Sequence, residues 1–520
     1  MSDSATMTAD PTPPGPAPLR PRATRPVSLA EACAGLGATL PVGDVEITGV
    51  SLDSRTIAPG ELYVALPGSH AHGAAFAAAA AGRGARAALT DPAGRDACVA
   101  AGLATVVVDD PRVAMATVSA RVFPTDRLTL LGITGTNGKT TTSYLVEAAL
   151  RAAGRRVGTV GTVGFRFDGG TLAGNRTTVT TPESPDLMAL LSVFAERGAD
   201  SVVMEVSSHA LALHRVDGVP FAVGAFVNLG RDHLDFHHTM EAYFEAKARL
   251  FEPGRCEVAV INIDDPQGRR LAERVATTGA ARLVTTGTDD AADYRILGWE
   301  PTATGSRFHV RTPTGSHRLE LALPGGYNVT NAVIALAMVG AVGVDPVTAA
   351  PGLASALVPG RMQIVDLGPG APRAVVDFAH TPQAIASVLS ALPAGSPVVV
   401  VVGAGGDRDV YKRTPMGEAA AAAADVVIVT DDNPRTEDPA AIRAGVLRGA
   451  RTPARAALVL EVADRRAAIL EGLRRAGSHG VVAVLGKGHE QGQDVAGRIL
   501  PFDDVAVVRD CWVTLSGEER

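Results

Sequence analysis

Leu128-Thr-Leu-Leu-Gly-Ile-Thr-Gly-Thr-Asn-Gly-Lys-Thr-Thr-Thr142 is an apolar run that stops at glycines, and it continues as Ser143-Tyr-Leu-Val-Glu-Ala-Ala-Leu-Arg-Ala-Ala153. The pattern predicts a strand, a phosphate-binding loop and a helix. Glycines let backbone N–H groups close around phosphate oxygens, and the helix N-terminus adds the positive end of a dipole. Lys139 adds a full charge, and the Thr140 hydroxyl can ligate Mg²⁺. The stretch therefore predicts a nucleoside triphosphate as ligand.

One position of this loop departs from the strict pattern, which places a glycine five residues before Gly138. That position is Ile133, so the loop is the variant Gly135-Thr-Asn-Gly-Lys-Thr140. A glycine turn that merely joins a strand to a helix is the alternative interpretation. A lysine followed by three threonines at the start of a helix favours the phosphate site.

Length and charge limit the possible classes of protein. The chain has 520 residues, which exceeds the size of one domain and suggests about three or four. Its formal charge is -7, with both signs spread along the chain, so it has no field that would attract nucleic acid or an anionic membrane. We expect small molecules as partners, and a monomer.

The cysteines and the N-terminus indicate the compartment. Cys33, Cys98, Cys256 and Cys511 lie far apart, which argues against a disulfide framework or a zinc site and suits a reducing cytoplasm. No apolar run reaches the roughly 18 residues of a spanning helix. Residues 1–26 are rich in Pro, Ala, Thr and Ser and lack the apolar segment of a secretory signal, so we expect a disordered tail.

From residue 27 to about 123 the pattern predicts a small α/β domain. Val45–Leu52 and Leu62–Leu66 are strand candidates, and the alanine-rich Ala74–Gly82 is a helix candidate.

A polar turn, Ser51-Leu-Asp-Ser-Arg-Thr-Ile-Ala-Pro-Gly60, lies within this domain. Ser54 and Arg55 could hold a diphosphate, since a guanidinium matches phosphate geometry. From the residues alone, a capped turn with an ion pair between Asp53 and Arg55 is the better-supported interpretation.

The second predicted domain covers residues 124–358 and begins at a linker marked by Pro124. Its strands alternate with helices, which predicts a parallel, doubly wound sheet. The predicted strands after the phosphate loop are Arg156–Val163, Ala199–Val206, Ala222–Asn228 and Glu257–Ile263. Open sheets of this kind place ligands beyond the carboxyl ends of their strands.

Two polar clusters lie at those strand ends, Glu205-Val-Ser-Ser-His209 and Asn228-Leu-Gly-Arg-Asp-His-Leu-Asp-Phe-His237. We expect both to face the phosphate loop. Glu205 and His233 are then candidate Mg²⁺ ligands beside Thr140, because Mg²⁺ prefers oxygen donors and bridges to phosphates. Histidine is an unusual Mg²⁺ ligand, and a hydrogen-bonded structural histidine is the alternative.

Other side chains of this domain are ambiguous from the residues alone. Thr180-Thr-Pro182 and Arg215 could contact a substrate. Lys247, in the predicted helix Met240–Phe251, has the pattern of a solvated surface lysine. Asn328 and Asn331 share one face of a helix that opens at a glycine turn, where ordinary capping would explain them.

The third predicted domain, residues 359–520, is again α/β. Its strand candidates are Arg373–Phe378, Pro397–Val402, Asp425–Thr430 and Val481–Leu485. Polar residues follow these strands, in Asp377-Phe-Ala-His380, Gly403-Ala-Gly-Gly-Asp-Arg-Asp409, Asp431-Asp-Asn-Pro-Arg-Thr-Glu437 and Gly486-Lys-Gly-His-Glu490. Any one of them is explained by a surface loop. Four at one sheet edge favour a second ligand site, in which arginine would meet a carboxylate and Asp432 or Glu490 an ammonium.

In combination these motifs resemble the Mur ligase family of peptidoglycan synthesis. The resemblance rests on Gly135–Thr140, Glu205–His209, Tyr327-Asn-Val-Thr-Asn331, Gly360-Arg-Met362 and Asp377-Phe-Ala-His-Thr-Pro382. It implies three domains: one for a UDP sugar, a central P-loop ATPase, and a Rossmann-like C-terminal domain that brings the incoming amino acid.

Two motifs are similar to the branch of the family that forms the UDP-N-acetylmuramoyl tripeptide: Ser51–Gly60 and Asp432-Asn-Pro-Arg435. The form Asp-Asn-Pro-Arg is associated with diaminopimelate rather than lysine. The resemblance implies a ligase that activates the D-Glu carboxylate of UDP-MurNAc-L-Ala-D-Glu with ATP as an acyl phosphate, which the amine of diaminopimelate then attacks.

The resemblance also implies roles for individual residues. The ATP site would include Gly135, Thr136, Asn137, Gly138, Lys139, Thr140, Thr141, Asn328, Asn331, Arg361, Asp377 and His380. The UDP-MurNAc-dipeptide site would include Ser54, Arg55, Thr180, Thr181, Ser207 and Arg215. The diaminopimelate site would include Arg408, Asp432, Asn433, Arg435, Gly486 and Glu490. Lys247 would carry a carbamate (N6-carboxylysine) that helps hold Mg²⁺ with Thr140, Glu205 and His233, and the catalytic residues would be Lys139, Lys247 and His233.

Two positions depart from the family pattern, namely Gln363, where glutamate usually follows Arg-Met, and Gln383, where aspartate usually follows His-Thr-Pro. They leave the details of the nucleotide contacts open. A folylpolyglutamate-type ligase and a nucleotide-binding regulatory protein without ligase activity are the alternatives. The Ser51–Gly60 motif speaks against the first, and intact Lys139 and Lys247 speak against the second.

Overall fold

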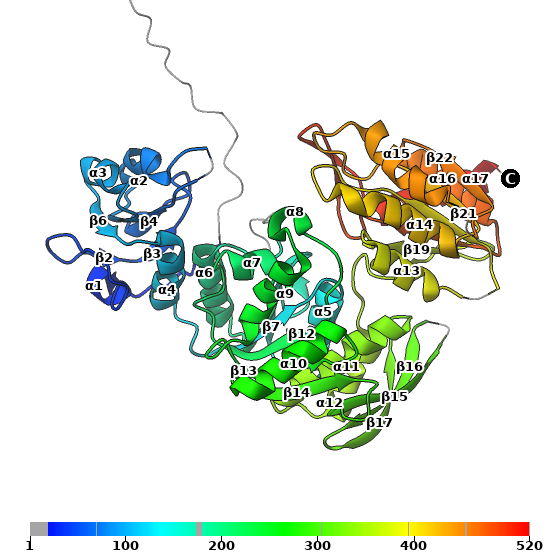
Figure 1. The fold of residues 1–520 in the computed structure, drawn as a ribbon, viewed down its shortest axis with the longest axis horizontal. Coiled ribbons are helices and arrows are strands. Elements are labelled where there is room, and N and C mark those ends of the chain that lie inside the picture. Colours follow the sequence, from blue (N-terminus) through cyan, green and yellow to red (C-terminus); the bar gives the residue numbers. More distant parts are fainter. Residues whose placement is uncertain are drawn as a thin grey trace, which may run out of the picture. The chain divides into compact units, whose positions relative to one another are not determined.

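The computed structural model describes residues 19–68, 70–172, 179–302, 304–393, 395–452 and 455–518 (Figure 1). By compactness the chain divides into two units. The first comprises residues 1–130, 156–202 and 209–220, and the second comprises residues 131–155, 203–208 and 221–520. Within the described ranges, no helix is both long enough and apolar enough to cross a membrane.

The N-terminal domain, within the first unit, is built on a four-stranded parallel sheet in the order β3-β4-β5-β6. Its elements are β1 (Val27–Ser28), α1 (Leu29–Ala32), β2 (Glu46–Ile47), β3 (Gly49–Ser51), β4 (Glu61–Ala65), η1 (Gly73–Phe76), α2 (Ala77–Gly82), β5 (Ala87–Thr90), α3 (Arg95–Ala100), β6 (Ala104–Val107) and α4 (Pro111–Val122). The predicted strand Val45–Leu52 is two short strands, and the predicted helix Ala74–Gly82 begins as a 3-10 turn.

The tail predicted for residues 1–26 lies mostly outside the described residues. The described part, residues 19–26, makes specific contacts. Arg20 pairs with the buried Glu61 at 2.7 Å, and the backbone N–H groups of Arg22 and Ala23 donate to the Glu196 carboxylate.

The central sheet has eleven strands in the order β10-β9-β8-β11-β7-β12-β13-β14-β15-β16-β17. The strands are β7 (Thr129–Thr134), β8 (Val157–Gly161), β9 (Gly164–Phe167), β10 (Gly170–Thr171), β11 (Ser201–Glu205), β12 (Phe221–Phe226), β13 (Cys256–Asn262), β14 (Arg282–Gly287), β15 (Tyr294–Pro301), β16 (Ser306–Thr312) and β17 (Gly315–Leu321). The strands from β7 through β12, β13 and β14 to β15 pair in parallel, as predicted.

The two ends of this sheet add antiparallel strands to the predicted parallel sheet. β8, β9 and β10 form antiparallel pairs, and so do β15, β16 and β17. The connections there, such as the two residues between β16 and β17, are too short for a parallel crossover. Hairpins are therefore the available geometry.

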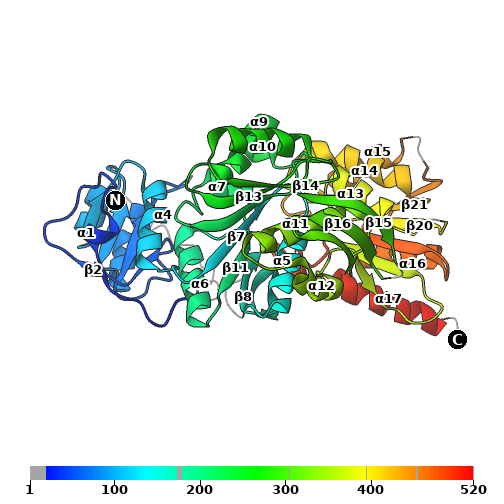
Figure 2. The same cartoon turned by 90° about the horizontal axis from the view of Figure 1, so that it is seen from below.

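Helices cover both faces of the parallel strands. They are α5 (Lys139–Ala152), α6 (Ser184–Glu196), α7 (Ser208–Ala212), α8 (Leu234–His237), α9 (Met240–Ala248), η2 (Arg249–Phe251), α10 (Pro266–Thr278), α11 (Gly326–Ala341) and α12 (Pro346–Ser355). Figure 2 shows α9 and α10 on one side and α5, α11 and α12 on the other. The loops after β7, β11 and β12 therefore emerge from a sheet edge that is rigidly supported.

The C-terminal domain has a six-stranded sheet in the order β18-β19-β23-β20-β21-β22, parallel except for β18. Its elements are β18 (Gln363–Val365), β19 (Arg373–Asp377), α13 (Pro382–Ser390), β20 (Val398–Val402), η3 (Val410–Lys412), α14 (Arg413–Ala423), β21 (Val426–Val429), α15 (Pro439–Ala450), β22 (Leu458–Glu461), α16 (Arg465–Ala476), β23 (Val481–Leu485), β24 (Gly492–Val495), β25 (Arg498–Pro501) and α17 (Asp504–Glu518).

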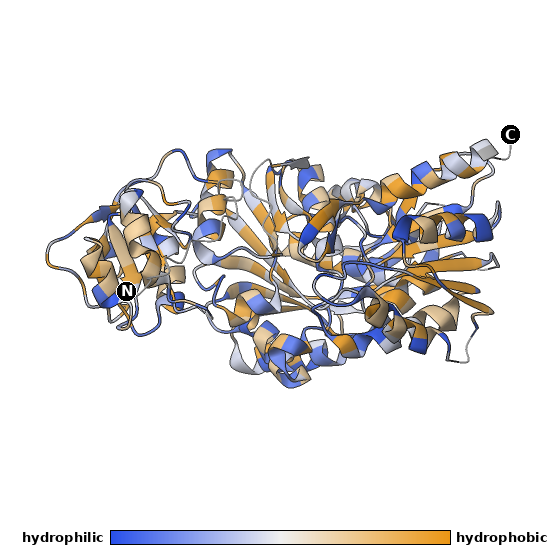
Figure 3. Ribbon diagram, turned by 90° about the horizontal axis from the view of Figure 1, so that it is seen from above, coloured by the Kyte–Doolittle hydropathy of each residue, from blue (hydrophilic) through white to orange (hydrophobic). Residues whose placement is uncertain are grey.

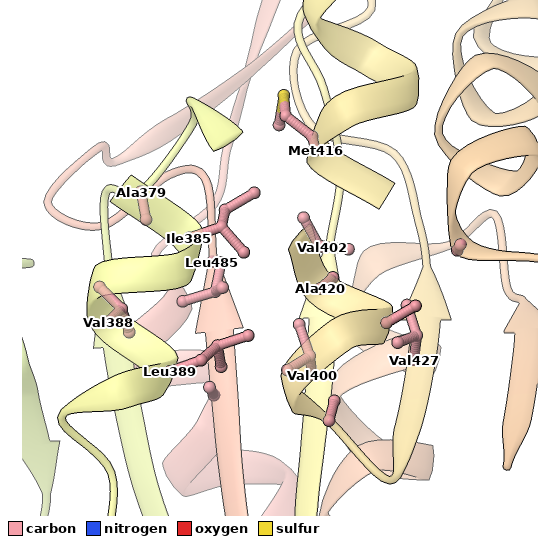
Figure 4. Close-up of a cluster of buried hydrophobic side chains, with 14 of the residues drawn as sticks. Ala379, Ile385, Val388, Leu389, Val400, Val402, Met416, Ala420, Val427 and Leu485 are labelled. Atoms are coloured by element: carbon pink, nitrogen blue, oxygen red, sulfur yellow. The ribbon is translucent and has the colours of Figure 1, made fainter. Parts of the chain in front are cut away.

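The central strands of this domain, β20, β21 and β23, are apolar on both faces, and Figure 3 draws the strands of this sheet mostly in the hydrophobic colour. Alternate residues of a strand point to opposite faces. Val400 and Val402 thus pack with Ile385 of α13 and Met416 of α14 (Figure 4). Val399 and Val401, on the opposite face of β20, pack instead against α16 and α17. Because both faces are buried, polar side chains of these segments are confined to the strand ends.

Candidate active site

The phosphate loop has the predicted form of strand β7, glycine turn and helix α5. Gly138 has a left-handed φ of 87°, and a Cβ there would lie 2.5 Å from the Asn331 side-chain oxygen. Only glycine suits this position. The departure at Ile133 has a simple cause, because this residue is fully buried within β7 and paired with Ala225 of β12. The turn begins after it.

Lys139 and Thr140 begin helix α5 and point to different partners. The Lys139 Nζ atom donates to the carbonyls of Gly135 at 2.8 Å and Thr136 at 3.0 Å, so it folds back over the loop. Burial lowers the pKa of the Lys139 amine, and the Glu205 carboxylate opposes this shift. The Thr140 hydroxyl lies 3.0 Å from both carboxylate oxygens of Glu205.

The pair of Thr140 and Glu205 suits the Mg²⁺ ion predicted from the sequence. Both supply oxygen donors, and Mg²⁺ commonly takes one or two protein oxygens and completes its shell with water and substrate phosphates. The described part of the chain holds no cluster of three or more His, Cys, Asp or Glu side chains arranged for a metal.

Lys247 is not the solvated lysine that its sequence pattern indicates, because its side chain is buried in the last turn of α9. Its Nζ atom donates to the Gly135 carbonyl at 2.8 Å and lies 4.4 Å from the centre of the Tyr243 ring. Burial holds the pKa of the Lys247 amine well below its ordinary value, and the nearby charge of Lys139 adds to this shift. Lys247 therefore belongs to the phosphate loop.

His233 starts helix α8 with a left-handed φ of 54° and lies beside Asp232, with 3.6 Å between Nε2 and Oδ2. Asp232 is a buried acid of the cluster expected to face the phosphate loop, and the sequence analysis gave it no role of its own. His380 and Lys412 also approach it, at 3.8 and 3.9 Å. Burial raises the pKa of Asp232, but a hydrogen bond with His380 and electrostatic interactions with His233, Lys412 and His380 outweigh it and hold this pKa well below its usual range.

Asn328 and Asn331, which were predicted to contact the nucleotide, are buried on α11. The Asn331 side-chain amide donates a hydrogen bond to the Asn328 side-chain oxygen at 3.3 Å. Asn328 also donates to the Pro324 carbonyl at 2.8 Å. The alternative of ordinary capping by Asn328 is wrong, because Gly325 is the N-cap of α11 and no side chain caps this helix.

Arg361 reaches the phosphate loop from the start of the C-terminal domain. Its guanidinium donates to the Thr140 hydroxyl at 3.3 Å and lies 4.5 Å from the centre of the Phe378 ring. Burial lowers the pKa of Arg361, while the Asp377 carboxylate opposes that shift. A cation with this burial would gain from the negative charge of a bound phosphate.

The side chains of Asp377 and His380, at the end of β19, contact backbone groups. The carboxylate of Asp377 accepts the N–H groups of Met362 and Ala379, at 2.7 and 2.8 Å. Its pKa is raised by burial, against the effect of Arg361. The His380 ring contacts the Phe378 carbonyl at 2.8 Å.

The two departures from the family pattern have different surroundings. Gln363 accepts the N–H of Gly360 at 2.8 Å and so braces the segment that carries Arg361, whereas Gln383 is exposed.

The residues predicted for the nucleotide sugar lie mostly in the first unit. Arg55 pairs with Asp53 through three hydrogen bonds of 2.9 to 3.3 Å, which is the capped turn that the residues alone favoured. Arg215 donates to the Thr181 carbonyl at 3.1 Å and to Glu183 at 2.9 Å. Three others were predicted for this site: Ser54 neighbours the pair, Thr180 contacts Thr162 at 3.2 Å, and Ser207 lies in the second unit.

Six residues were predicted to bind the incoming amino acid. The C-terminal domain brings four of them together at the ends of β21 and β23. Asn433 donates to Glu490 at 2.8 Å, and Asp432 fills the space beside Gly486, where a Cβ would lie 2.3 Å from its carboxylate. The remaining two predicted residues contact the adjacent loop: Arg435 donates to the Gly406 carbonyl, and Arg408 donates to that of Asp407 at 3.3 Å.

Lys487 is the residue of this cluster that sequence reasoning missed. Its side chain is fully buried, and its Nζ atom donates to Asn433 and Glu490, both at 3.0 Å. The available signal was a lysine placed between two glycines in Gly486-Lys-Gly-His-Glu490, directly after a buried strand.

Comparisons with known proteins match this chain over nearly its whole length. Residues 46–123 match the model described as "Mur ligase family, catalytic domain", residues 133–339 the "Mur ligase middle domain", and residues 360–488 the "Mur ligase, glutamate ligase domain". A relative from Streptomyces coelicolor, called UDP-N-acetylmuramoyl-L-alanyl-D-glutamate–2,6-diaminopimelate ligase, is 47% identical over 95% of this chain and 98% of its own.

Solved structures give the same result. One described as UDP-N-acetylmuramoyl-L-alanyl-D-glutamate–2,6-diaminopimelate ligase is 33% identical with a TM-score of 0.66, covering 95% of this chain and 100% of that one. A folylpolyglutamate synthase of Mycobacterium tuberculosis complexed with ADP and AMPPCP shares only the fold, at 19% identity and a TM-score of 0.58 over 77% of this chain and 93% of that one. The chain belongs to the Mur ligase family.

Proposed function

We propose that the protein is an ATP-dependent ligase that adds diaminopimelate to the D-Glu carboxylate of UDP-MurNAc-L-Ala-D-Glu, in cytoplasmic synthesis of peptidoglycan precursors. The observation that carries the proposal is the 47% identity, over 95% of the chain, to a relative named for this reaction. Such coverage includes the phosphate loop and the amino-acid cluster together, so both halves of the reaction have residues to perform them.

The first half-reaction belongs to the phosphate loop. The D-Glu carboxylate attacks the γ-phosphorus of ATP, a P–O bond forms, the bond to the β-phosphate bridging oxygen breaks, and ADP leaves. Lys139 and Arg361 offset the charge on the transferring phosphoryl group, and the N–H groups of the loop hold the phosphates in line. Thr140 and Glu205 would hold Mg²⁺, which supplies further neutralisation of phosphate charge when bound.

Lys247 is proposed to carry a carbamate. A neutral amine is the form that attacks CO₂, and burial lowers the pKa of Lys247 in favour of that form. A new N–C bond forms between the neutral amine and CO₂, and the nitrogen then loses one proton to solvent, so the neutral side chain becomes an anionic one. Counted from the cationic ammonium form, two protons leave. The change would replace the repulsion between Lys247 and Lys139 by attraction. A carboxylate at this position would be able to join the magnesium site, and the His233 ring lies 6.1 Å from the Tyr243 ring that Lys247 contacts.

The second half-reaction uses the C-terminal cluster. The amine of diaminopimelate attacks the activated carbonyl, phosphate leaves, and the ammonium formed loses a proton. We propose that Arg408 and Arg435 bind the distal carboxylate, since guanidinium suits a carboxylate, and that Asp432 and Glu490 bind the distal ammonium. Positioning of the amine then supplies most of the acceleration, with no covalent enzyme intermediate. We further propose that the protein works as a monomer on small-molecule substrates.

One experiment tests the proposal directly. Phosphate release is measured for the purified protein with ATP, Mg²⁺ and UDP-MurNAc-L-Ala-D-Glu, in separate reactions with meso-diaminopimelate, LL-diaminopimelate, L-lysine or no amino acid. Release only with a diaminopimelate is expected, and the accepted isomer is read from the same data. Release with lysine alone would overturn the selectivity assigned to Arg435. Release without any amino acid would favour a regulatory ATPase.

A further inference from the structure

Lys487 lies behind the amino-acid cluster and is fully buried, although it carries a charged side chain. It is flanked by Gly486 and Gly488, which have φ values of 114° and 55°. Such backbone conformations strongly favour glycine. The Glu490 N–H closes the turn by donating to the Lys487 carbonyl at 3.0 Å. The two glycines thus allow a turn that directs this lysine inward, at the end of the buried strand β23.

Among the residues that the structure describes, the side-chain hydrogen bonds of Lys487 go to side chains of the proposed diaminopimelate site. Its Nζ atom donates to the Asn433 Oδ1 atom and the Glu490 Oε2 atom, both at 3.0 Å. The same Oε2 atom accepts the Asn433 amide at 2.8 Å, and the Asp494 N–H donates to Asn433 at 2.9 Å. Lysine, amide and carboxylate form a closed triangle that fixes each of the three side chains.

This triangle leaves Glu490 open on one side. In the part of the chain that the structure describes, the hydrogen bonds to its carboxylate fall on Oε2 alone, and the side chain keeps 32% of its exposure. Lys487, with no exposure, cannot itself reach a ligand. A cationic group arriving from solvent would therefore meet Oε1, while the buried lysine holds Oε2.

We propose that Lys487 is a positioning residue for the incoming amino acid, which acts through Glu490 and Asn433 by fixing one carboxylate oxygen and presenting the other to the ammonium group of the ligand. The inference rests on the proposed function, because it takes the amino acid as the occupant of this cluster. A second consequence follows from charge. Removal of Lys487 leaves the cluster one unit more negative, which disfavours the distal carboxylate of diaminopimelate relative to lysine, which lacks it.

The test is steady-state kinetics of the full-length Lys487→Met variant, with each of the three substrates varied in turn. We expect the KM for diaminopimelate to rise about tenfold or more, as for the loss of a hydrogen bond to a charged group. The KM values for ATP and for UDP-MurNAc-L-Ala-D-Glu should stay within about twofold. The preference for diaminopimelate over L-lysine should fall. An equal rise of all three KM values, or a lower melting temperature with unchanged KM, would overturn the proposal.

A double-mutant cycle separates positioning from general stability. If Lys487 acts through Glu490, the variant Lys487→Met/Glu490→Gln should have the same KM for diaminopimelate as Glu490→Gln alone. Additive effects would contradict this. The double variant also leaves no buried charge unpaired, so it supplies the comparison if Lys487→Met does not fold. Arg443→Met is the matched control, since Arg443 is a largely buried cation of the same domain paired with Asp431 and Glu461. It should leave the KM unchanged.

The unmodified protein distinguishes this inference from the proposed function. If it accepts a different amino acid, the proposed function fails, and the KM for that amino acid is the quantity that Lys487→Met must raise. If it has no turnover that depends on an amino acid, both fail.

Discussion

Lys139 is the residue whose removal tests the phosphate loop most simply. Among the described residues, the hydrogen bonds of its Nζ atom go to carbonyls of the loop. Lys139→Ala therefore takes a hydrogen bond from no buried carboxylate. We expect phosphate release to fall by about 1000-fold or more, because the charge on the transferring phosphoryl group loses a preorganised partner. The melting temperature should change little. Arg151→Ala, at the exposed end of the same helix, is the control, and an active Lys139→Ala protein would refute the assignment.

The carbamate at Lys247 makes a second prediction for one side chain. Lys247→Ala should lower activity by at least about 100-fold, and short carboxylates such as formate or acetate should restore part of it by occupying the vacated space. Lys247→Arg keeps a cation but cannot form a carbamate, so carboxylates should not rescue it. The measurement is phosphate release at increasing carboxylate concentration. Normal activity of Lys247→Ala would eliminate the role.

For individual residues, the sequence predicted which chemical groups form the site better than it predicted which side chains are buried. The pattern around Gly135–Thr140 was enough to predict a strand, loop and helix, and Glu205 was correctly expected beside Thr140. The burial of Lys247 could not be read from its helix, because Glu241 and Glu245 give that helix the composition of a solvated face. Lys487 was missed for a similar reason, since burial depends on how distant segments pack.

Among the elements, strands were predicted well wherever both faces are buried. β20, β21 and β23 are continuous apolar runs, and each lies within a predicted strand or matches it. β22 was not predicted although its first three residues form a short apolar run, and in the structure they are only partly buried. The hairpin of β24 and β25 was not predicted because its residues are partly or fully exposed and it lacks a continuous apolar run. Strand pairing by short hairpins likewise leaves no trace in an alternation of strands and helices.

Helices α16 and α17 are joined by a buried ion pair. Arg465 donates to Asp504 at 2.7 and 2.8 Å and to the Leu485 carbonyl at 3.0 Å, and neither side chain has any exposure. Arg465→Met should lower the free energy of unfolding by about 3 to 5 kcal/mol, because it strands the Asp504 charge in the interior. Arg465→Met/Asp504→Leu should recover much of the loss.

Urea denaturation measures both variants. The control is Arg455→Met, which breaks a half-exposed pair with Asp425 and should cost less than about 1 kcal/mol. Equal losses for Arg465→Met and the double variant would mean that the cavity, rather than the unpaired charge, causes the effect.

For the whole molecule, the sequence was enough to predict α/β domains and a ligand site at strand ends, because both follow from local periodicity and topology. The domain boundaries near residues 124 and 359 stay predictions. The compact units cut across the central segment instead, with residues 156–202 and 209–220 grouped with the N-terminal domain. Compactness depends on contacts between distant segments, which periodicity does not report.

Each of the two units carries two buried cysteines, and their raised pKa values link its stability to alkaline pH. Burial raises the pKa of Cys33, in the first unit, and of Cys256, in the second, from 9.0 to about 11. Between pH 9 and 11 the unfolded chain loses these thiol protons while the folded chain keeps them. The unfolded state then binds fewer protons, so the free energy of unfolding falls as the pH rises, by about 2 to 3 kcal/mol per thiol. Buried Lys139, with a lowered pKa, acts in the opposite direction up to its ordinary pKa of 10.5.

Urea denaturation of the unmodified protein and of Cys33→Ala/Cys256→Ala from pH 8 to 11 isolates the effect of these two thiols, because Lys139 and the other two cysteines are common to both proteins. The variant should start less stable but lose less stability above pH 9, and parallel curves would show that the thiols do not set the alkaline limit.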